Sequence, residues 1–306
     1  MIRVATFASQ QLSLAQQMRT QSQWAEANIQ VSSGKQSRDY AGIAINSSRL
    51  ISLENMHQGL SSYIANINIT DSRLQTMESS IASIFDVATE VRTLLLGALS
   101  AGNAEDAAVS QTTSIMLEEV AARLNASQDG RYLFSGSTIG TPPVDLANFD
   151  PDDVSYDAND PTLANAGYYA GDDTVLSVRV DDAVILDYGV LATESGIEAL
   201  LRGLYLASTA APTDTARLES ALDLMNTAID ELPDIRSRIG TTRAALEQTK
   251  AAHSEVQLFA EREISDIENV DVVQVMTRIS ALQLQLEASY MIMARLSNLS
   301  LLNFLR

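Results

Sequence analysis

The sequence predicts a mainly α protein: an elongated antiparallel helical coiled-coil rod that carries a small inserted β-rich domain. All six prolines lie between Pro142 and Pro233, which leaves the first 141 and the last 73 residues without proline. Long helices tolerate interior proline badly, at a cost of about 3 kcal/mol each, so both flanks can be helical. Aromatic residues make up only 5% of the chain, which favours thin helical layers over a thick core.

The first segment, residues 1–45, is expected to form an N-terminal assembly helix. Its apolar residues follow a heptad, but glutamines fill the intervening positions at 11 and 21. The stripe consists of Val4, Phe7, Leu14 and Met18. Such a stripe buries too little to hold a short helix alone, so we expect the C-terminal stripe to be its partner.

Residues 46–130 are expected to form a long helical hairpin. A first helix from about residue 44 to 99, roughly 80 Å long at 1.5 Å per residue, has apolar residues in steps of three, four and seven. They are Leu60, Ile64, Ile67, Leu74, Met77, Ile81, Ile84, Ala88, Val91 and Leu95. A second helix from about residue 104 to 127 carries Val109, Met116, Val120 and Leu124, with Thr113 as a polar interruption.

Residues 131–192 are expected to form the inserted, acidic β-rich domain. Leu176, Val178 and Val180 alternate with polar residues, as in a half-buried strand, and residues 182–183 can turn the chain into a second strand at 184–186. At the start of the insert we expect Gly130 to end the preceding helix in a left-handed conformation. Large apolar groups would then cap the rod tip; this junction comprises Gly130, Tyr132, Leu133, Phe134 and Gly136.

The chain should then return through helices at 193–265, with Pro233 and Asp234 starting a long helix, and break at 266–271. Residues 266–306 are expected to form the C-terminal assembly helix, because apolar residues again step by three and four. That stripe runs through Val272, Val275, Ile279, Leu282, Leu286, Ser289, Met293 and Leu296.

A heptad stripe most often forms a core within a single chain. The middle parts of the long helices, about 45–100 and 235–265, fit that interpretation. The terminal stripes differ because glutamine and serine stand where a self-sufficient seam would have leucine. We therefore expect the ends to pack against neighbouring copies as well as each other. The expected interface comprises Phe7, Leu14, Met18, Val272, Val275, Ile279, Leu282, Leu286, Met293, Leu296 and Leu299.

No constellation of catalytic or metal-binding residues stands out, so we expect no enzyme, cofactor or metal. There is no cysteine, no HExxH and no GxSxG, and the two histidines, His57 and His253, sit within separate predicted helices. The Asp150–Asp160 run could suggest calcium, but Tyr156 and Asp157 stand where the turn glycine would be needed. A solvated acidic loop explains the run better.

Charge and hydropathy exclude two classes of partner. The net charge is −19, and residues 145–187 hold eleven Asp but one cation, Arg179, which argues against nucleic acid. No window approaches about 18 uninterrupted apolar residues, so no transmembrane helix is expected. The N-terminus lacks the apolar stretch of a cleavable export signal.

Six short segments carry a resemblance to the flagellin family of bacterial axial proteins. Residues 31–35 (VSSGK) and 64–67 (IANI) are similar to the N-terminal region of that family. Within the family, residues 130–136 (GRYLFSG) and 169–173 (YAGDD) resemble the subunits of the hook–filament junction. Residues 268–271 (ENVD) and the tail at 299–305 (LSLLNFL) are similar to the C-terminal signature. After VSSGK the family's SDDPAG-like stretch is replaced by SRDYAG at 37–42.

The resemblance implies a structural protein of the bacterial flagellum, an adapter layer joining the hook side to the flagellin filament. Its implied partners are other copies of itself, flagellin, a neighbouring hook-associated protein and an export chaperone, with type III export delivering it outside the cell. One alternative is a filament flagellin, since many flagellins end in a similar tail. A second is a secreted helical adhesin or surface-binding module that uses its acidic insert.

Overall fold

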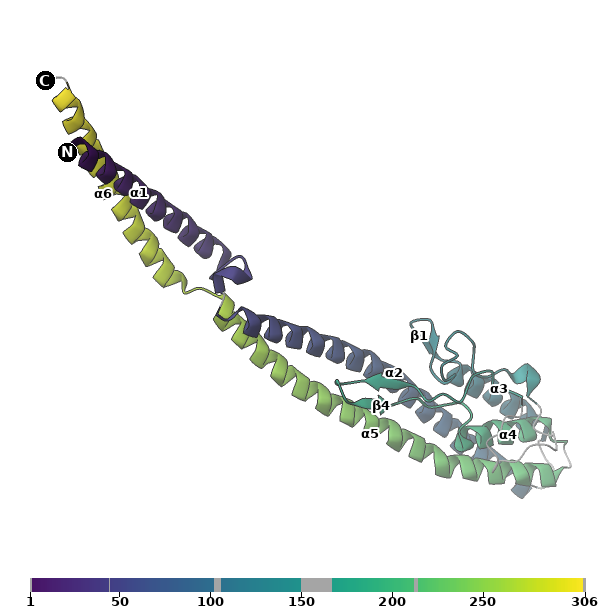
Figure 1. Ribbon diagram of the computed structural model, residues 1–306. Helices are drawn as coiled ribbons and strands as arrows, with labels where there is room; N and C mark the ends of the chain where they lie inside the picture. The colour runs from purple at the N-terminus through teal and green to yellow at the C-terminus, as the bar shows by residue number, and fades with distance from the viewer. Residues whose placement is uncertain (1, 44, 102–105, 150–166, 212–213, 305–306) are drawn as a thin grey trace. The chain divides into compact units, whose positions relative to one another are not determined.

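The computed structural model describes residues 2–43, 45–101, 106–149, 167–211 and 214–304. The side chains of residues 2–10, 101, 106–107, 148 and 296–304 lie outside this description. Within the described part the protein is mainly α, with two small β-hairpins, which confirms the predicted class (Figure 1). No described helix is both long and apolar enough to span a lipid bilayer.

Six α-helices account for most of the described chain. They are α1 (Ile2–Ser33), α2 (Ser47–Ala101), α3 (Asp106–Leu124), α4 (Ser195–Thr209), α5 (Thr215–Glu268) and α6 (Val272–Phe304). The strands are β1 (Ser127–Gln128), β2 (Arg131–Tyr132), β3 (Ser177–Arg179) and β4 (Ile185–Asp187), with short 3₁₀ turns η1 (Tyr40–Ile43) and η2 (Leu146–Asn148). The chain divides into two compact units, a terminal unit (Met1–Gly59 with Val256–Arg306) and a central unit (Leu60–Glu255).

The central unit contains a continuous apolar core. From Ile67 onward the predicted stripe of α2 is buried, as are Val109, Met116, Val120 and Leu124 of α3, so these two periodicity predictions are confirmed. Residues of α4 and α5, among them Leu200, Leu204 and Leu232, join the same core. Arg243 of α5 adds ion pairs to Asp71 (2.8 Å) and Glu78 (2.7 Å) of α2. The unit is therefore held by side chains that it supplies itself.

The prediction for Gly130 is wrong. α3 ends earlier, at Leu124, and Gly130 (φ +74°) instead follows Asp129 (φ +55°) in the two-residue turn of the β1–β2 hairpin. A turn of this kind needs positive φ at both central residues, for which Asp-Gly is a favoured pair. The Asp-Gly signal therefore belonged to a hairpin rather than to a helix end.

The second hairpin follows its sequence pattern. β3 pairs antiparallel with β4 in the register Ser177↔Asp187, Val178↔Leu186 and Arg179↔Ile185. Val180 is buried and Leu176 and Val178 are half-buried, whereas Ser177 and Arg179 are exposed, as the alternation predicts.

The predicted helix start at Pro233 is also wrong. Pro233 lies inside α5, which begins at Thr215 and continues to Glu268. Proline removes one helical N–H bond, but the neighbouring Leu232, Ile235 and Ile239 are all buried in the central core. Burial of a side chain of this kind contributes about 1.5–3 kcal/mol, so packing on both sides offsets the lost bond. The break predicted at 266–271 is confirmed between α5 and α6.

In the terminal unit, α1 and α6 lie side by side and run in opposite directions (Figure 1). The start of α2 and the end of α5 form a separate small core of Leu50, Leu53, Ala260 and Ile267. An exposed ion pair between Arg49 and Glu263 joins the same two helices.

Candidate assembly surface

The face of α1 that packs on α6 is built mainly from small and polar residues. Its seam positions are spaced by three, four and seven, and they are half-buried or buried in the terminal unit: Ser13, Gln17, Thr20, Ala27 and Val31. The Ser13 hydroxyl donates to the Sδ atom of Met293, 3.8 Å away on α6. Small residues let two helices approach closely, but they bury little apolar area.

The structure corrects the predicted face of α1. The heptad pattern places Leu14 and Met18 opposite the C-terminal stripe, but in the structure they are 51% and 64% exposed. They stand one position after the seam residues Ser13 and Gln17, and one residue is about 100° around a helix. Phe7 lies outside the residues whose side chains are described.

On α6, three of the predicted stripe residues are buried in the terminal unit. Val275, Leu282 and Leu286 are buried, Ile279 and Met293 are half-buried, and Val272 is exposed. Leu296 and Leu299 lie outside the described side chains. A lone copy therefore already brings the C-terminal stripe and α1 together.

A second apolar face of α6 stays exposed, and the heptad stripe of the sequence does not include it. Val273, Leu284 and Met291, which we call the outer stripe, are 76%, 69% and 60% exposed. Their spacings of 11 and 7 residues correspond to about three and two helical turns, so they share one face. Burying three such side chains would contribute roughly 5–9 kcal/mol, which makes this face a candidate contact for another molecule.

Charge is divided between the terminal helices and the rest of the chain. α1 and α6 together contain four arginines and two glutamates, a net charge of +2. Because the whole chain has a net charge of −19, the residues outside α1 and α6 have a net charge of −21. The terminal helices have little charge that would oppose close packing of copies.

The predicted rod-tip junction lies inside the central unit. Leu133 and Phe134 are buried in its core, Tyr132 is half-buried, and the Phe134 carbonyl accepts from the Ala192 amide at 3.1 Å. Gly136 has φ +68°, and a Cβ there would collide with Asp172. The tip segment is thus fixed by packing rather than exposed for a ligand.

Asp172 holds this segment in place, a role that the sequence did not reveal. Its carboxylate accepts from the Ser137 amide (2.8 Å) and hydroxyl, the Thr138 hydroxyl and the Thr174 amide (3.1 Å). Chiefly the Ser137 hydroxyl, then its amide, hold the pKa of Asp172 below the ordinary value. Burial, followed by the charge of Asp172, raises the pKa of the neighbouring Tyr169.

His253 has a structural role. His253 is buried in the central unit, stacks on Tyr63 with ring centroids 5.8 Å apart, and donates through Nε2 to the Val180 carbonyl at 2.7 Å in the matching tautomer. The Tyr63 hydroxyl donates to Asp182 at 2.6 Å. These contacts fasten the β3–β4 turn to α2 and α5. His57 lies near the Gln257 amide, 3.4 Å away.

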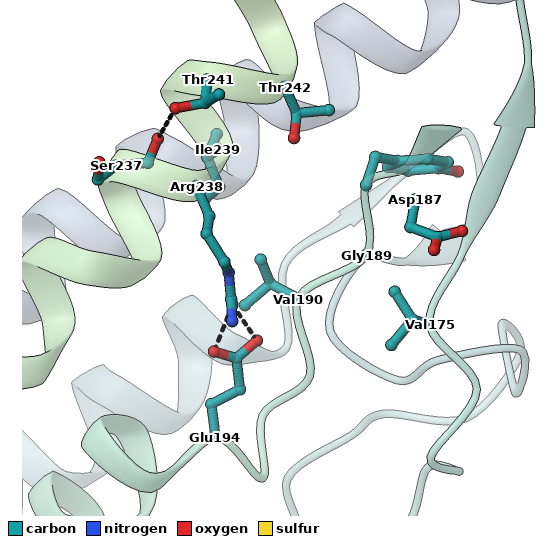
Figure 2. A pocket seen from close by; sticks show the side chains of 11 residues that line it. Val175, Asp187, Gly189, Val190, Glu194, Ser237, Arg238, Ile239, Thr241 and Thr242 are labelled. Carbon is teal, nitrogen blue, oxygen red and sulfur yellow. Dashed lines mark hydrogen bonds and ion pairs between the residues drawn. The ribbon is translucent and has the colours of Figure 1, made fainter. Parts of the chain in front are cut away.

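A cavity of about 420 Å³ opens between the β4–α4 connection and α5 in the central unit (Figure 2). Arg238 reaches across it to Glu194, with Nη2 2.6 Å from Oε1 (Figure 2). Its lining contains hydroxyls from Tyr188, Ser237, Thr241 and Thr242 and the carboxylate of Asp187, but neither histidine nor cysteine. Arg238 and Glu194 are therefore paired with each other across the cavity.

Among the residues that the structure describes, no cluster of three or more His, Asp or Glu could hold a metal ion. The run Asp150–Asp160 that raised the calcium alternative lies outside the described residues.

Two family models match the two flanks of the chain. The model of the bacterial flagellin N-terminal helical region matches residues 4–138, and that of the flagellin C-terminal helical region matches residues 222–305. Together these regions span more than two thirds of the sequence. The chain belongs to the flagellin family. As a member it is a structural subunit of the extracellular bacterial flagellum rather than an enzyme.

Solved structures of hook-associated proteins share the fold. FlgL of Bacillus cereus is 18% identical with a TM-score of 0.57, and the match covers 70% of this chain and 99% of that one. Hook-associated protein 3 of Legionella pneumophila is 10% identical, with a TM-score of 0.56 and coverage of 71% and 98%. FlgL of Xanthomonas campestris is 12% identical, with a TM-score of 0.54 and coverage of 68% and 97%. No curated protein is significantly similar to the chain.

Proposed function

We propose that this protein forms the adapter layer between the hook side and the flagellin filament, and that copies assemble through α1 and α6. The observation that carries the assembly mode is the outer stripe of α6. In a lone copy the inner face of α6 already packs on α1, whereas Val273, Leu284 and Met291 remain exposed. A neighbouring copy, presenting the same kind of stripe, would cover these residues.

The junction role is favoured over the filament role by two observations. The similar solved structures named above are FlgL or hook-associated protein 3, and this chain spans 97–99% of their lengths. Residues 130–136 also follow the junction-subunit pattern. A filament flagellin is the second candidate, because the same terminal family models match.

Under this proposal, residues 1–45 and 266–306 are the assembly segments, 46–130 and 193–265 the helical body, and 131–192 the acidic insert. Leu14, Met18 and Val272, which are exposed in the lone copy, join the outer stripe in contacting neighbours, while Val275, Leu282 and Leu286 hold α6 to α1. The partners are further copies, flagellin, a neighbouring hook-associated protein and an export chaperone that covers α6 before type III secretion.

Paired substitutions test the assembly mode. Leu284→Asp should abolish incorporation onto isolated hooks that lack this layer, because a charge would have to be buried in the contact. Ile115→Asp is the matched control, since Ile115 is 60% exposed on α3 of the central unit. Both variants should keep the circular dichroism of the parent. Normal incorporation of Leu284→Asp would remove the outer stripe from the proposal.

Seeded polymerisation separates the two roles. A junction subunit added to hooks should stop after a limited layer, visible by electron microscopy with immunogold label at the distal end of the hook. Indefinite extension with label along the filament would identify a filament flagellin instead.

A further inference from the structure

Two loops of the terminal unit, far apart in sequence, lie directly against each other. One follows α1 and the other joins α5 to α6. We infer that this contact, which we call the clasp, sets the axial register of α1 against α6. The clasp comprises Gly34, Lys35 and Gln36 on one side and Glu268, Asn269 and Val270 on the other.

The clasp is built mainly from backbone hydrogen bonds. The Val270 amide donates to the Gly34 carbonyl at 3.0 Å, and the Gln36 amide donates to the Glu268 carbonyl at 2.6 Å. Lys35 and Asn269 form an antiparallel bridge between them. Backbone bonds of this kind fix the two loops to one relative position, because a shift of one residue would break both.

Helix caps connect the clasp rigidly to both helices. Gly34, at φ +70°, ends α1 and donates its amide to the Gln30 carbonyl at 2.9 Å. On the other side the Asp271 carboxylate accepts from the Val273 and Gln274 amides at 2.9 and 3.1 Å, which caps α6. The end of α1 and the start of α6 are therefore held at the same level.

The side chains of the clasp contribute less. Lys35 Nζ lies 3.0 and 2.9 Å from the two carboxylate oxygens of Glu268, but the Lys35 side chain is 51% exposed. Exposed ion pairs of this kind stabilise weakly. The Gln30 side-chain amide also donates to the Gln36 carbonyl at 2.8 Å.

The helices need such a device because their seam specifies register poorly. Four of the five seam positions, Ser13, Gln17, Thr20 and Ala27, offer no large apolar side chain that fits a single hole on α6. On α6, Val275, Leu282, Leu286 and Met293 are similar in size and apolar character. Sliding α6 by one turn or one heptad would place similar residues opposite each other, so side chains alone discriminate little between registers.

Disulfide trapping in the isolated full chain tests the inference, independently of the proposed function. The protein has no cysteine, so introduced pairs report without interference. Ser13→Cys with Met293→Cys reports the observed register, since Ser13 Oγ lies 3.8 Å from Met293 Sδ. Ser13→Cys with Ser289→Cys reports a slip of about one turn of α6.

Gly34→Val is the disrupting change, because a β-branched residue is strained at φ +70° although no atom lies within 4 Å of the added Cβ. We expect the ratio of crosslinking at 13–293 to that at 13–289 to fall at least about five-fold, the fold-change that corresponds to about 1 kcal/mol of strain. Gly140→Val is the control. Gly140 lies in the central unit, has equally open surroundings and has no positive φ, so this change should leave the crosslinking ratio unchanged.

A second variant keeps the test decisive. Val270→Pro removes the N–H that donates to Gly34 and should shift the ratio in the same direction, whereas Lys35→Met should shift it much less. An unchanged ratio in both Gly34→Val and Val270→Pro would overturn the inference. Loss of both crosslinks would contradict it too, because a register device predicts redistribution rather than separation of the helices.

Discussion

The central unit and the terminal helix pair, α1 with α6, both pack helices together, but they use different kinds of side chain at the contact. In the central unit Leu74, Ile81, Leu124 and Phe134 are fully buried in one continuous apolar core. In the terminal pair, α1 contributes Ser13, Gln17, Thr20 and Ala27 to its seam, while Val273 and Leu284 on α6 stay exposed.

The difference shows that long helices alone do not make a unit stable without a partner. α1 and α6 are long, with 32 and 33 residues. Yet most helical stability in proteins comes from burying an apolar face, and this pair buries little of its own. The central unit should therefore fold as an independent body, and the terminal pair should be the weaker part of a lone copy.

The largest effect should come from matched core truncations. Phe134→Ala should destabilise the central unit by about 3–5 kcal/mol, whereas Leu286→Ala should cost the terminal pair about 2 kcal/mol or less. Trp24 of α1 is the single tryptophan, so its fluorescence follows the terminal pair, while hydrogen exchange of α3 and α4 follows the central unit.

Leu286→Ala should lower the denaturant midpoint of the Trp24 signal only, and Phe134→Ala should lower only that of hydrogen-exchange protection in α3 and α4. Denaturant should change the Trp24 signal before the central amides lose protection. Coincident transitions, or a Phe134→Ala variant that shifts the Trp24 signal equally, would show that the two regions form one cooperative body.

A smaller effect should come from the tip segment of the central unit. Gly136→Ala should destabilise that unit by roughly 1–3 kcal/mol, because φ is +68° and the new methyl would collide with Asp172. Gly140→Ala, with open space and no positive φ, is the control and should be close to neutral. The difference in melting temperature between the two variants measures the effect, and equal values would contradict the assigned strain.

Asp172→Asn should have a weaker, pH-dependent effect. The folded-state pKa of Asp172 is depressed, so its stabilisation is present above the ordinary value of 3.8 and is lost as pH falls below it. The variant should melt below the parent at pH 7, and the gap should narrow as the pH falls under about 4. A gap that stays constant down to pH 2 would argue against the carboxylate contacts.

The smallest effect should come from exchanging buried threonines. Thr20 and Thr113 are both buried and both donate to the carbonyl four residues earlier. Thr20→Val should slow hydrogen exchange of α1 slightly, because it replaces a hydroxyl in the polar seam with a methyl group. The free energy of opening of α1 should rise by less than about 1 kcal/mol. Thr113→Val, within an already apolar core, is the comparison. An equal rise in the free energy of opening there would mean that the seam of α1 is no poorer in apolar contacts than the central core.

The sequence predicted the helices and much of the central core because the apolar period is unbroken there. From Ile67 to Leu95 each predicted position is buried, and the β3–β4 strands follow their alternation. The face of α1 could not be predicted in the same way. Its large residues Leu14 and Met18 mark one face, but the close approach of α6 selects the small residues beside them.

The remaining errors have local physical causes. Asp129 and Gly130 signal left-handed backbone, which serves a helix end and a two-residue hairpin equally well. Pro233 is a helix breaker by propensity, but burial on both sides of it outweighs one lost hydrogen bond. The clasp combines two segments that family resemblance had marked separately, and nothing local in either predicts their contact. The five-part division of the chain and the neighbour contacts stay predictions.

The unequal distribution of charge has a consequence for crowding. Copies that meet through weakly basic termini still carry about twenty negative charges each on the remainder of the chain. Mutual repulsion between these acidic portions grows with every added subunit and is damped by dissolved ions. The number of molecules that can gather at one place should therefore depend on the ionic composition of the surrounding fluid, even though the surfaces that join them are largely uncharged.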